Sequence, residues 1–306
     1  LLVILIHYLK KSLTIFFSFI KMISALSIKN TLNTNQILFN LKNKINKCPL
    51  CSSKLISENY KILNISQCNN CKFIFRNKEK TTNSDLIEGA YYSSKKIGSI
   101  VNKRFVKHFS KRANQHFNFI KKFFTDQPKK GLDIGCGAGF FMKKLIEHNW
   151  SAVGIEPDPT MSAYAKKNGL NVEQKLLEDF HYADRFGLIY LSHVLDDIPY
   201  INNSLEKISN LICENGLLFV EVPNYSWSYR LNFTKEEDIR IGQYFFSYDT
   251  LHKVMKKHGF EMIKQYSFES VHTNSIYQKI SSPLRVLIKL KPSKMKSYLR
   301  GIYRKI

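Results

Sequence analysis

Three alternating glycines are the chemical feature of this sequence that stands out first. Gly135, Gly137 and Gly139 lie within GLDIGCGAGF, residues 131–140, where a short apolar segment meets a segment with helical periodicity. Glycine suits such a turn because some turn positions need a positive φ, and because a ligand lying across the turn needs close access to the backbone. The pattern predicts a site for a nucleoside-type ligand; the alternative is a glycine-rich turn that binds nothing.

An acidic residue follows the glycines at a spacing that fits the same ligand. Glu156 ends the apolar segment SAVGIE, seventeen residues after the last glycine. In an open doubly wound sheet, the carboxyl end of the second strand lies beside the glycine turn, and a carboxylate there can accept hydrogen bonds from both ribose hydroxyls. We therefore expect Glu156 to hold a ribose.

Two pairs of cysteines predict a metal site. CPLC and CNNC place Cys48, Cys51, Cys68 and Cys71 in two Cx2C turns that are sixteen residues apart. Two such turns facing each other supply four thiolates, which is the ligand set of a closed tetrahedral Zn²⁺ site. Since no coordination position is left for water, the sequence predicts a structural zinc ribbon over residues 48–80. A redox role is disfavoured because the thioredoxin-like context is missing.

Segments with alternating strand and helix patterns surround the glycine turn. Strand patterns cover residues 131–136, 151–157, 171–177 and 186–194, and residues 211–223 hold a helix end, an Asn-Gly turn and a fifth strand. Helical patterns lie between the strands and again in 244–268, which closes with a further strand. This alternation predicts an α/β fold with a mostly parallel sheet and helices on both faces. Residues 83–125 read as helical, and we expect a lid or substrate-positioning helix with Arg112 on a solvated face; nucleic-acid contact is the alternative.

Charge and cysteine usage restrict the partners and the compartment. The 306 residues carry a formal net charge of +23, and 44% of them are hydrophobic, so the chain can bury a core. The charge favours nucleic acid, phosphorylated metabolites or an acidic membrane surface, although an AT-rich genome would also enrich lysine. The pairing of four of the six cysteines is unlike a secreted disulfide framework, so we expect a cytoplasmic protein.

The two ends of the chain are basic and apolar. Residues 1–47 form an N-terminal extension in which Lys10 and Lys11 split the apolar residues, so that neither half is long enough to span a bilayer. We interpret this extension either as a basic amphipathic segment on a membrane surface or as an over-extended start. Residues 281–306 form a basic amphipathic tail, expected to be a solvated helix or to lie on a membrane or an acidic partner, which would make the protein membrane-associated.

Five motifs in order resemble a known family. They are LDIGCGAGFF, GIEPD, FGLIYLSHVLDDIP, ENGLLFVEVPN and YFFSYDTLHKVMKKHGFEMI. With them, residues 85–280 resemble the small-molecule subgroup of the class I S-adenosylmethionine-dependent methyltransferases, preceded here by the four-cysteine zinc ribbon. The resemblance implies a Rossmann-like, doubly wound, mostly parallel seven-stranded sheet, with S-adenosyl-L-methionine as cofactor besides the structural Zn²⁺.

The resemblance also implies roles for single residues. Asp133 and the glycine turn would lie beneath the methionine part of the cofactor, and Glu156 would hold its ribose. The other expected cofactor contacts are Pro157 beside the ribose, Leu177 and Asp179 in the loop bordering adenine, and Ser192 at the end of the fourth strand. His193 follows, where this fold meets substrate, and is the candidate general base; a structural hydrogen bond is the alternative.

The resemblance leaves the acceptor open. We expect a small polar acceptor, such as a sugar or saccharide intermediate, because a cysteine zinc module ahead of this fold resembles bacterial sugar and natural-product methyltransferases. An RNA methyltransferase with a zinc-binding recognition module is the second interpretation, supported by the net charge. A non-catalytic scaffold is the third. Asp196, Asp197 and Gln243 depart from the subgroup, which often has Glu-His and His there, so a mechanism based on those histidines does not transfer.

Overall fold

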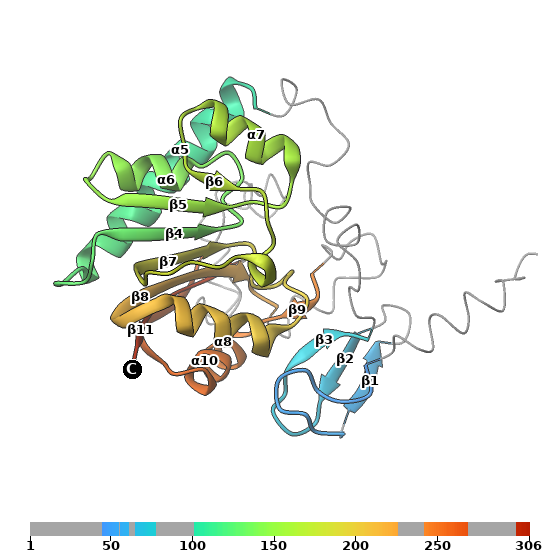
Figure 1. Cartoon of the computed structure of the whole chain (residues 1–306). Helices are drawn as coiled ribbons and strands as arrows, with labels where there is room; N and C mark the ends of the chain where they lie inside the picture. The colour runs from blue at the N-terminus through green and yellow to red at the C-terminus, as the bar shows by residue number, and fades with distance from the viewer. Residues whose placement is uncertain (1–44, 55, 61–64, 78–100, 226–241, 269–297) are drawn as a thin grey trace, which may run out of the picture. The chain divides into compact units, whose positions relative to one another are not determined.

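The computed structural model describes residues 45–54, 56–60, 65–77, 101–225, 242–268 and 298–306 (Figure 1). Ile45–Ile306 form one compact unit, and the larger part of the predicted N-terminal extension, residues 1–44, lies outside the described residues. Residues 83–100 of the predicted helical region and 281–297 of the predicted tail also lie outside them. In the described part, no helix combines the length and the apolar character that crossing a bilayer requires.

The centre of the unit is a seven-stranded sheet. Its strand order is β10-β11-β8-β7-β4-β5-β6, in which the five strands from β8 to β6 are parallel and β11 is antiparallel to both of its neighbours. The strands are β4 (Lys130–Ile134), β5 (Ser151–Ile155), β6 (Val172–Glu173), β7 (Phe186–Ser192), β8 (Ile212–Pro223), β10 (Phe260–Phe268) and β11 (Tyr298–Lys305). The predicted mostly parallel, doubly wound sheet is confirmed.

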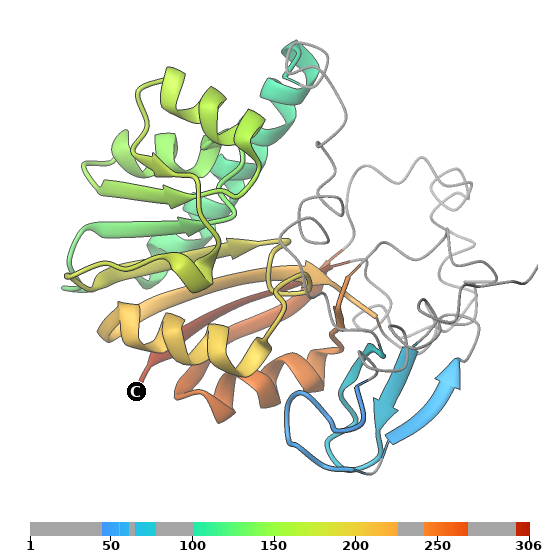
Figure 2. The ribbon, with the colours of Figure 1, turned by 45° about the vertical axis from the view of Figure 1, so that its right-hand side comes forward.

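Helices cover both faces of this sheet, as Figures 1 and 2 show. On one face lie α5 (Lys103–Ile120), α6 (Phe140–Ile146) and α7 (Pro159–Lys167), and on the other lie α8 (Ile201–Leu211) and α10 (Tyr248–Lys257). Strand β7 contributes side chains to the apolar cores on both faces of the sheet. Ile189 and Leu191 belong to the core under α8 and α10, while Leu188 and Tyr190 belong to the core under α5 and α6, because successive side chains point to opposite faces.

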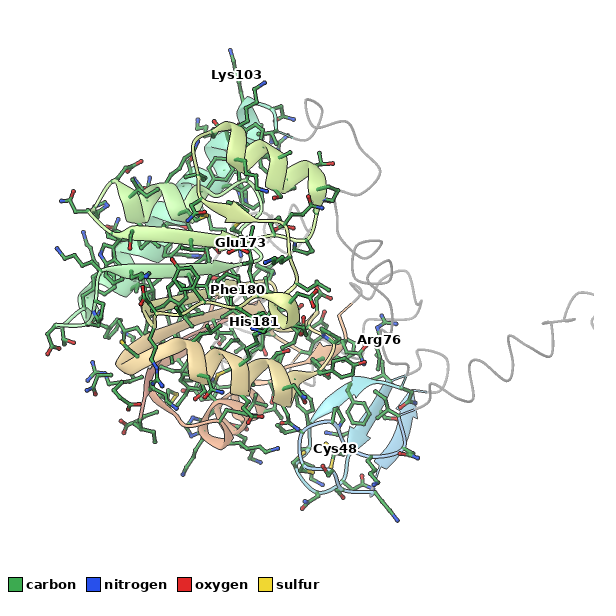
Figure 3. All side chains as sticks on the ribbon, viewed as in Figure 1. Cys48, Arg76, Lys103, Glu173, Phe180 and His181 are labelled. Carbon is green, nitrogen blue, oxygen red and sulfur yellow. The ribbon has the colours of Figure 1, made fainter. Side chains whose placement is uncertain are left out.

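The helix before the sheet, α5, begins with a side-chain cap. Asn102 accepts a hydrogen bond from the backbone N–H of Phe105 over 3.0 Å, which satisfies one of the unpaired donors of the first turn. Its buried side chains include Phe117 and Ile120, in the spacing that the sequence predicted. Lys103 at its start is exposed and points away from the domain (Figure 3). The helix therefore packs on the sheet through one apolar stripe.

The C-terminal residues correct one expectation from sequence. Residues 298–305 are not a solvated helix or surface tail; they form β11, which pairs with β8 on one side and with β10 on the other. Leu299 and Tyr303 face one core and Ile302 faces the other, so the strand is buried on both sides. Basic residues between these apolar ones gave the segment its tail-like composition, but non-local pairing with two strands determines its structure.

The cysteine-rich segment forms a second, four-stranded sheet. Its order is β1 (Ile56–Tyr60), β2 (Ile65–Cys68), β3 (Ile74–Arg76) and β9 (Tyr244–Phe245), all antiparallel. The last strand comes from the segment just before α10, so the ribbon is completed by a distant part of the chain. Phe73 and Phe75 of the ribbon share a core with Tyr244 and Phe246. The ribbon and the larger sheet are separate sheets that share one apolar core.

Candidate functional site

The glycine turn links β4 to α6 at the carboxyl end of the parallel strands. Gly135, Gly137 and Gly139 have φ values of 69°, 54° and 76°, which favour glycine. A Cβ on Gly135 would lie 2.4 Å from a methyl carbon of Val194, and one on Gly139 would lie 2.1 Å from a methyl carbon of Leu170. At Gly137 the nearest described atom would be 3.9 Å away. The outer glycines therefore permit close packing, and the middle one leaves an open stretch of backbone.

Glu156 lies directly after β5, beside this turn. One carboxylate oxygen accepts the backbone N–H of Gly137 over 2.7 Å, and the other accepts that of Asp158 over 2.9 Å. Burial raises the pKa of Glu156 from its ordinary 4.5 to about 7, although these two hydrogen bonds oppose the shift. The carboxylate retains further lone pairs for hydroxyl donors. The structure thus brings Glu156 and Gly137 together, as the spacing predicted.

Asp133 lies in β4, fully enclosed next to the same turn. Among the described residues, its Oδ1 atom has no hydrogen-bond partner and is buried. Burial first, and the nearby Glu156 second, raise the pKa of Asp133 well above its ordinary value. Buried polar atoms are normally paired, so an unpaired carboxylate oxygen needs an explanation such as a missing ligand. A donor from a bound molecule would satisfy it, and a cationic donor would do so best.

The remaining predicted cofactor contacts near the glycine turn are Pro157, Leu177 and Asp179, and they differ in solvent exposure. Asp158, after the half-buried Pro157, caps α7 by accepting the backbone N–H groups of Thr160 and Met161 over 2.8 and 2.9 Å. Leu177 is buried in the core and Asp179 is exposed, both in the 3-10 turn η3 (Leu177–Asp179). Contact of these residues with a cofactor stays a prediction.

S-adenosylmethionine fits the groups found at this turn. Its ribose hydroxyls and its ammonium group are donors, and the turn presents two buried carboxylates and one open glycine. Two carboxylates whose pKa values are raised by burial gain stability from donors that favour their charged forms. The donor set of the ligand and the acceptor set of the site are therefore complementary.

Ser192 and His193 stand at the carboxyl end of β7, the neighbour of β4. His193 has a φ of 59°, and its backbone N–H donates to the carbonyl of Glu221 over 2.8 Å. Ser192 Oγ accepts a hydrogen bond from Arg112 over 2.8 Å. Val194, the next residue, packs on Gly135. The structure therefore places the candidate base on the loop that contacts the glycine turn.

A buried charge cluster around Glu221, in β8, was not predicted. Its carboxylate meets Arg112 from α5 at 2.5 Å, Arg300 from β11 at 2.6 Å and His116 from α5 at 3.1 Å. Arg112 is thus an ion-pair partner, which corrects the expectation of a solvated face. The sequence offered two signals for this cluster. One is a glutamate inside the apolar run LLFVEVP, and the other is a basic pair four residues apart on α5.

Not every titratable side chain in the Glu221 cluster is charged at pH 7. Burial lowers the pKa of His116 to about 4, so this histidine is neutral at pH 7. Burial would raise the pKa of Glu221, but His116, His193 and Arg112 outweigh burial and hold it well below its usual range. At pH 7 the cluster therefore holds two guanidinium cations, one ionised carboxylate and a neutral His116, which leaves one positive charge in excess.

The four predicted cysteines converge. The sulfur atoms of Cys48, Cys51, Cys68 and Cys71 all lie within 4.8 Å of one another, with close pairs at 3.5 and 3.6 Å, and all four are free thiols. Tetrahedral zinc with Zn–S bonds of about 2.3 Å places its sulfurs about 3.8 Å apart, so the cluster fits that metal. The backbone N–H of Cys71 also donates to the sulfur of Cys68. Cys48 lies beside β1 to β3 in Figure 3.

The ribbon contacts the loop that follows His193. The backbone N–H groups of Gln243 and Tyr244 both donate to the carbonyl of Asp196, over 2.7 and 3.0 Å. Arg76 of the ribbon donates through Nε to the carbonyl of Gly242 over 2.9 Å. Gln243, which departs from the resembled subgroup, thus has a structural role between the ribbon and this loop.

Comparison with known proteins assigns the family. The sequence profile of the methyltransferase domain matches residues 106–265, just over half of the chain, and the chain belongs to this family. The predicted family is therefore confirmed, and with it the class of S-adenosylmethionine-dependent methyltransferases.

The chain is also similar to individual proteins. A ubiquinone biosynthesis O-methyltransferase from Glaesserella parasuis is 32% identical over 31% of this chain and 46% of its own length. One from Pelagibacter ubique is 29% identical over 35% of this chain and 50% of its own length. The chain thus spans half or less of the length of these relatives. The crystal structure of a methyltransferase from Thermotoga maritima is 20% identical, covers 68% of this chain and 97% of its own, and superposes with a TM-score of 0.49.

Proposed function

We propose that this chain transfers a methyl group from S-adenosylmethionine to a hydroxyl group of a small polar acceptor. The observation that carries the proposal is the acceptor set at one end of the parallel strands: the open backbone of Gly137, the unpaired oxygen of Asp133 and the carboxylate of Glu156. The names of the matched relatives support oxygen as the methylated atom.

Each group of this set receives one part of the cofactor in the proposal. Asp133 accepts hydrogen bonds from the ammonium group, Glu156 accepts them from the ribose hydroxyls, and Gly137 lets the ligand approach the backbone. Pro157, Leu177 and Asp179 border the adenosine, and Ser192 lies at the methionine end. The bound cofactor supplies an electrophilic methyl group on a sulfonium.

The chain itself must then orient the acceptor and take up its proton. A productive arrangement holds the acceptor oxygen about 3 to 3.5 Å from the methyl carbon. His193, at the end of β7, is the candidate to accept the hydroxyl proton because imidazole titrates near neutral pH.

A radiolabel assay tests this proposal. Protein is incubated with S-adenosylmethionine labelled in the methyl group and with separate pools of phenols, sugars and nucleotide sugars, and products are separated from RNA by size. We expect label in a small molecule, with the sugar pools testing the predicted saccharide acceptor. Binding of S-adenosylhomocysteine without transfer to any hydroxyl compound would refute the acceptor class but not the cofactor site.

An RNA acceptor is the second candidate, favoured by the net charge of +23. Contacts to phosphates make affinity fall steeply as salt rises. The matching experiment measures binding of bulk RNA at low and physiological salt and looks for label in RNA. Label in RNA, with none in small molecules, would replace the first proposal.

We also propose that the cysteine cluster binds one structural Zn²⁺. Its support is the convergence of the four sulfurs from two turns. Four thiolates leave no position for water, so the ion would stabilise the ribbon and take no part in the reaction. Elemental analysis of the purified protein is expected to give one zinc per chain, and a Cys51→Ser variant is expected to give less. Absence of zinc from folded, active protein would contradict the site.

A further inference from the structure

The two arginines of the Glu221 cluster are used differently. Arg300 donates from Nε to Glu221 over 2.7 Å and from Nη1 to the Tyr266 hydroxyl over 3.0 Å, and its Nη2 lies 2.6 Å from Glu221. Arg112 contacts Glu221 at 2.5 Å and Ser192 Oγ at 2.8 Å with one nitrogen, Nη2. Among the described residues, Nε and Nη1 of Arg112 donate to no acceptor, which leaves three of the five N–H donors of this guanidinium.

The spare donors of Arg112 are open to a ligand. The side chain of Arg112 is 24% exposed, against 11% for Arg300 and 2% for Glu221. In the described part of the chain, the buried nitrogen and oxygen atoms that lack a partner include none of Arg112. The cluster therefore presents one guanidinium group at the surface and keeps the other inside.

The described residues of this cluster carry one more positive than negative charge at pH 7. His116 is neutral because burial lowers its pKa to about 4, and Glu221 is ionised because its partners hold its pKa low. Two guanidinium cations then face one carboxylate, and protonation of His193, 3.5 Å from Glu221, would add to the excess. Charged groups removed from water are normally paired. An anionic group beside Arg112 would restore the balance.

Arg112 lies close to the proposed cofactor turn. Ser192, which it contacts, is the last residue of β7. Ile134 of β4 pairs with Leu191 of β7, so Ser192 is level with Gly135, the first glycine of the turn. The guanidinium group therefore stands one strand away from the turn, at the same edge of the sheet.

We propose that Arg112 binds a carboxylate or phosphate group of a ligand at the carboxyl end of β7. This role rests on the proposed function for the place of the ligand, and it extends that function by naming the charge of the bound group. A guanidinium suits both anions because its planar N–H donors match the oxygen atoms of either. Two ligands can bring such an anion to this edge: S-adenosylmethionine through the carboxylate of its methionine part, or the acceptor through an acidic group near the methylated hydroxyl.

Calorimetry with two cofactor analogues distinguishes these sources. The wild type and Arg112→Gln are titrated with S-adenosylhomocysteine and with its decarboxylated analogue, which keeps the amino group. If the cofactor carboxylate is the anion, Arg112→Gln binds S-adenosylhomocysteine about 10- to 100-fold more weakly and binds the decarboxylated analogue as the wild type does. If the acceptor supplies the anion, the variant binds both analogues as the wild type does.

The second arm uses protein saturated with S-adenosylhomocysteine. Hydroxybenzoate, a uronic acid and a sugar phosphate are each titrated beside a neutral counterpart, hydroxybenzamide or the parent sugar. If the acceptor supplies the anion, the wild type binds at least one acid about tenfold more tightly than its counterpart, and Arg112→Gln loses this preference. Arg112→Lys, which keeps the charge with fewer donors, should keep part of it. Arg104→Gln, at an exposed arginine of the same helix, is the matched control and should bind as the wild type does.

Urea unfolding separates a binding role from a structural one. All three nitrogens of the Arg300 guanidinium have partners, so Arg300→Gln should lower the urea midpoint strongly. Arg112→Gln should unfold close to the wild-type midpoint, because Glu221 stays paired with Arg300. Failure of Arg112→Gln to fold would make Arg112 a structural residue like Arg300 and overturn the inference.

The outcomes also distinguish this role of Arg112 from the proposed function. If folded Arg112→Gln matches the wild type in both binding arms, Arg112 binds no ligand anion and the inference is overturned, whatever compound is methylated. If an acid or the cofactor carboxylate binds in an Arg112-dependent way but no hydroxyl compound is methylated, the proposed acceptor chemistry fails while the role of Arg112 holds.

Discussion

Replacing Glu156 by glutamine should stabilise the free protein and weaken its hold on the cofactor. The carboxylate is buried, and its pKa is raised to about 7 from an ordinary 4.5. Above pH 7 the folded chain therefore carries a charge that costs more than the same charge in the unfolded chain. A neutral isostere removes that cost, although it also removes the acceptor that would hold the ribose.

The size of the stabilising effect follows from the pKa difference. Each pKa unit corresponds to about 1.4 kcal/mol, so the penalty at high pH is about 3 kcal/mol. Glutamine can still accept the N–H of Gly137 with its oxygen, but its NH₂ group then faces the N–H of Asp158, which costs about 1 kcal/mol. We therefore expect Glu156→Gln to raise the free energy of unfolding by about 2 kcal/mol at pH 8.5.

The sign of this effect depends on pH in a defined way. Below pH 4.5 the carboxyl group is protonated in both the folded and the unfolded chain, so the charge penalty vanishes. Between pH 4.5 and 7 the folded chain binds the proton first, and the gain from the substitution grows with pH. Urea unfolding at pH 5 and pH 8.5 measures it, since a stabilised variant has a higher midpoint at unchanged slope.

The same substitution should weaken binding of the ligand. Hydrogen bonds to a charged group contribute about 1.5–3 kcal/mol, so the variant should bind S-adenosylhomocysteine about 10- to 100-fold more weakly in isothermal titration calorimetry. The reasoning is refuted if Glu156→Gln is less stable than wild type at pH 8.5, or if it binds the ligand as tightly. Asp184→Asn, which changes an exposed acid, is the control and should alter neither quantity.

Three other predictions concern separate parts of the molecule. Cys68→Ser should lower the temperature of a single unfolding transition in calorimetry, because the ribbon shares its core with the larger sheet; a separate ribbon transition would contradict this. Acidification from pH 6.5 to 4 should cost up to about 3 kcal/mol of unfolding free energy through His116, whose pKa burial lowers to about 4, since the unfolded chain takes up the proton first. In urea titrations at the two pH values, His116→Gln should not show this loss. An equal loss of unfolding free energy in the wild type and the variant would refute the prediction. Deleting residues 298–306 should abolish folding because β11 joins β8 to β10; a truncated chain with a wild-type circular dichroism spectrum would contradict that.

Residue types and short spacings in the sequence were enough to predict the glycine turn and the cysteine cluster. The glycines at 135, 137 and 139 need positive φ, and two Cx2C turns bring their sulfurs together, so residue type and short spacing sufficed. Glu156 was found because parallel strands end at a common edge. In each case the structure depends on contacts within a strand, a turn or neighbouring strands of a regular sheet.

The features that the sequence did not predict depend on contacts between distant parts of the chain. Residues 298–305 pair with β8 and β10 although three of these eight residues are basic. The Glu221 cluster unites α5, β8 and β11, which are far apart in the chain, so no spacing rule connects Arg112 to Arg300. Tyr244 and Phe245, expected to lead into a helix, instead complete the ribbon sheet.

A crystal structure with S-adenosylhomocysteine tests the central claim most directly, because the claim is a set of contacts at one turn. We predict that both ribose hydroxyls lie within hydrogen-bond distance of the Glu156 carboxylate, and that the amino group lies at Oδ1 of Asp133 with the backbone of Gly137 beneath the ligand. A ligand bound elsewhere, or one whose ribose and amino group contact neither carboxylate, would contradict it.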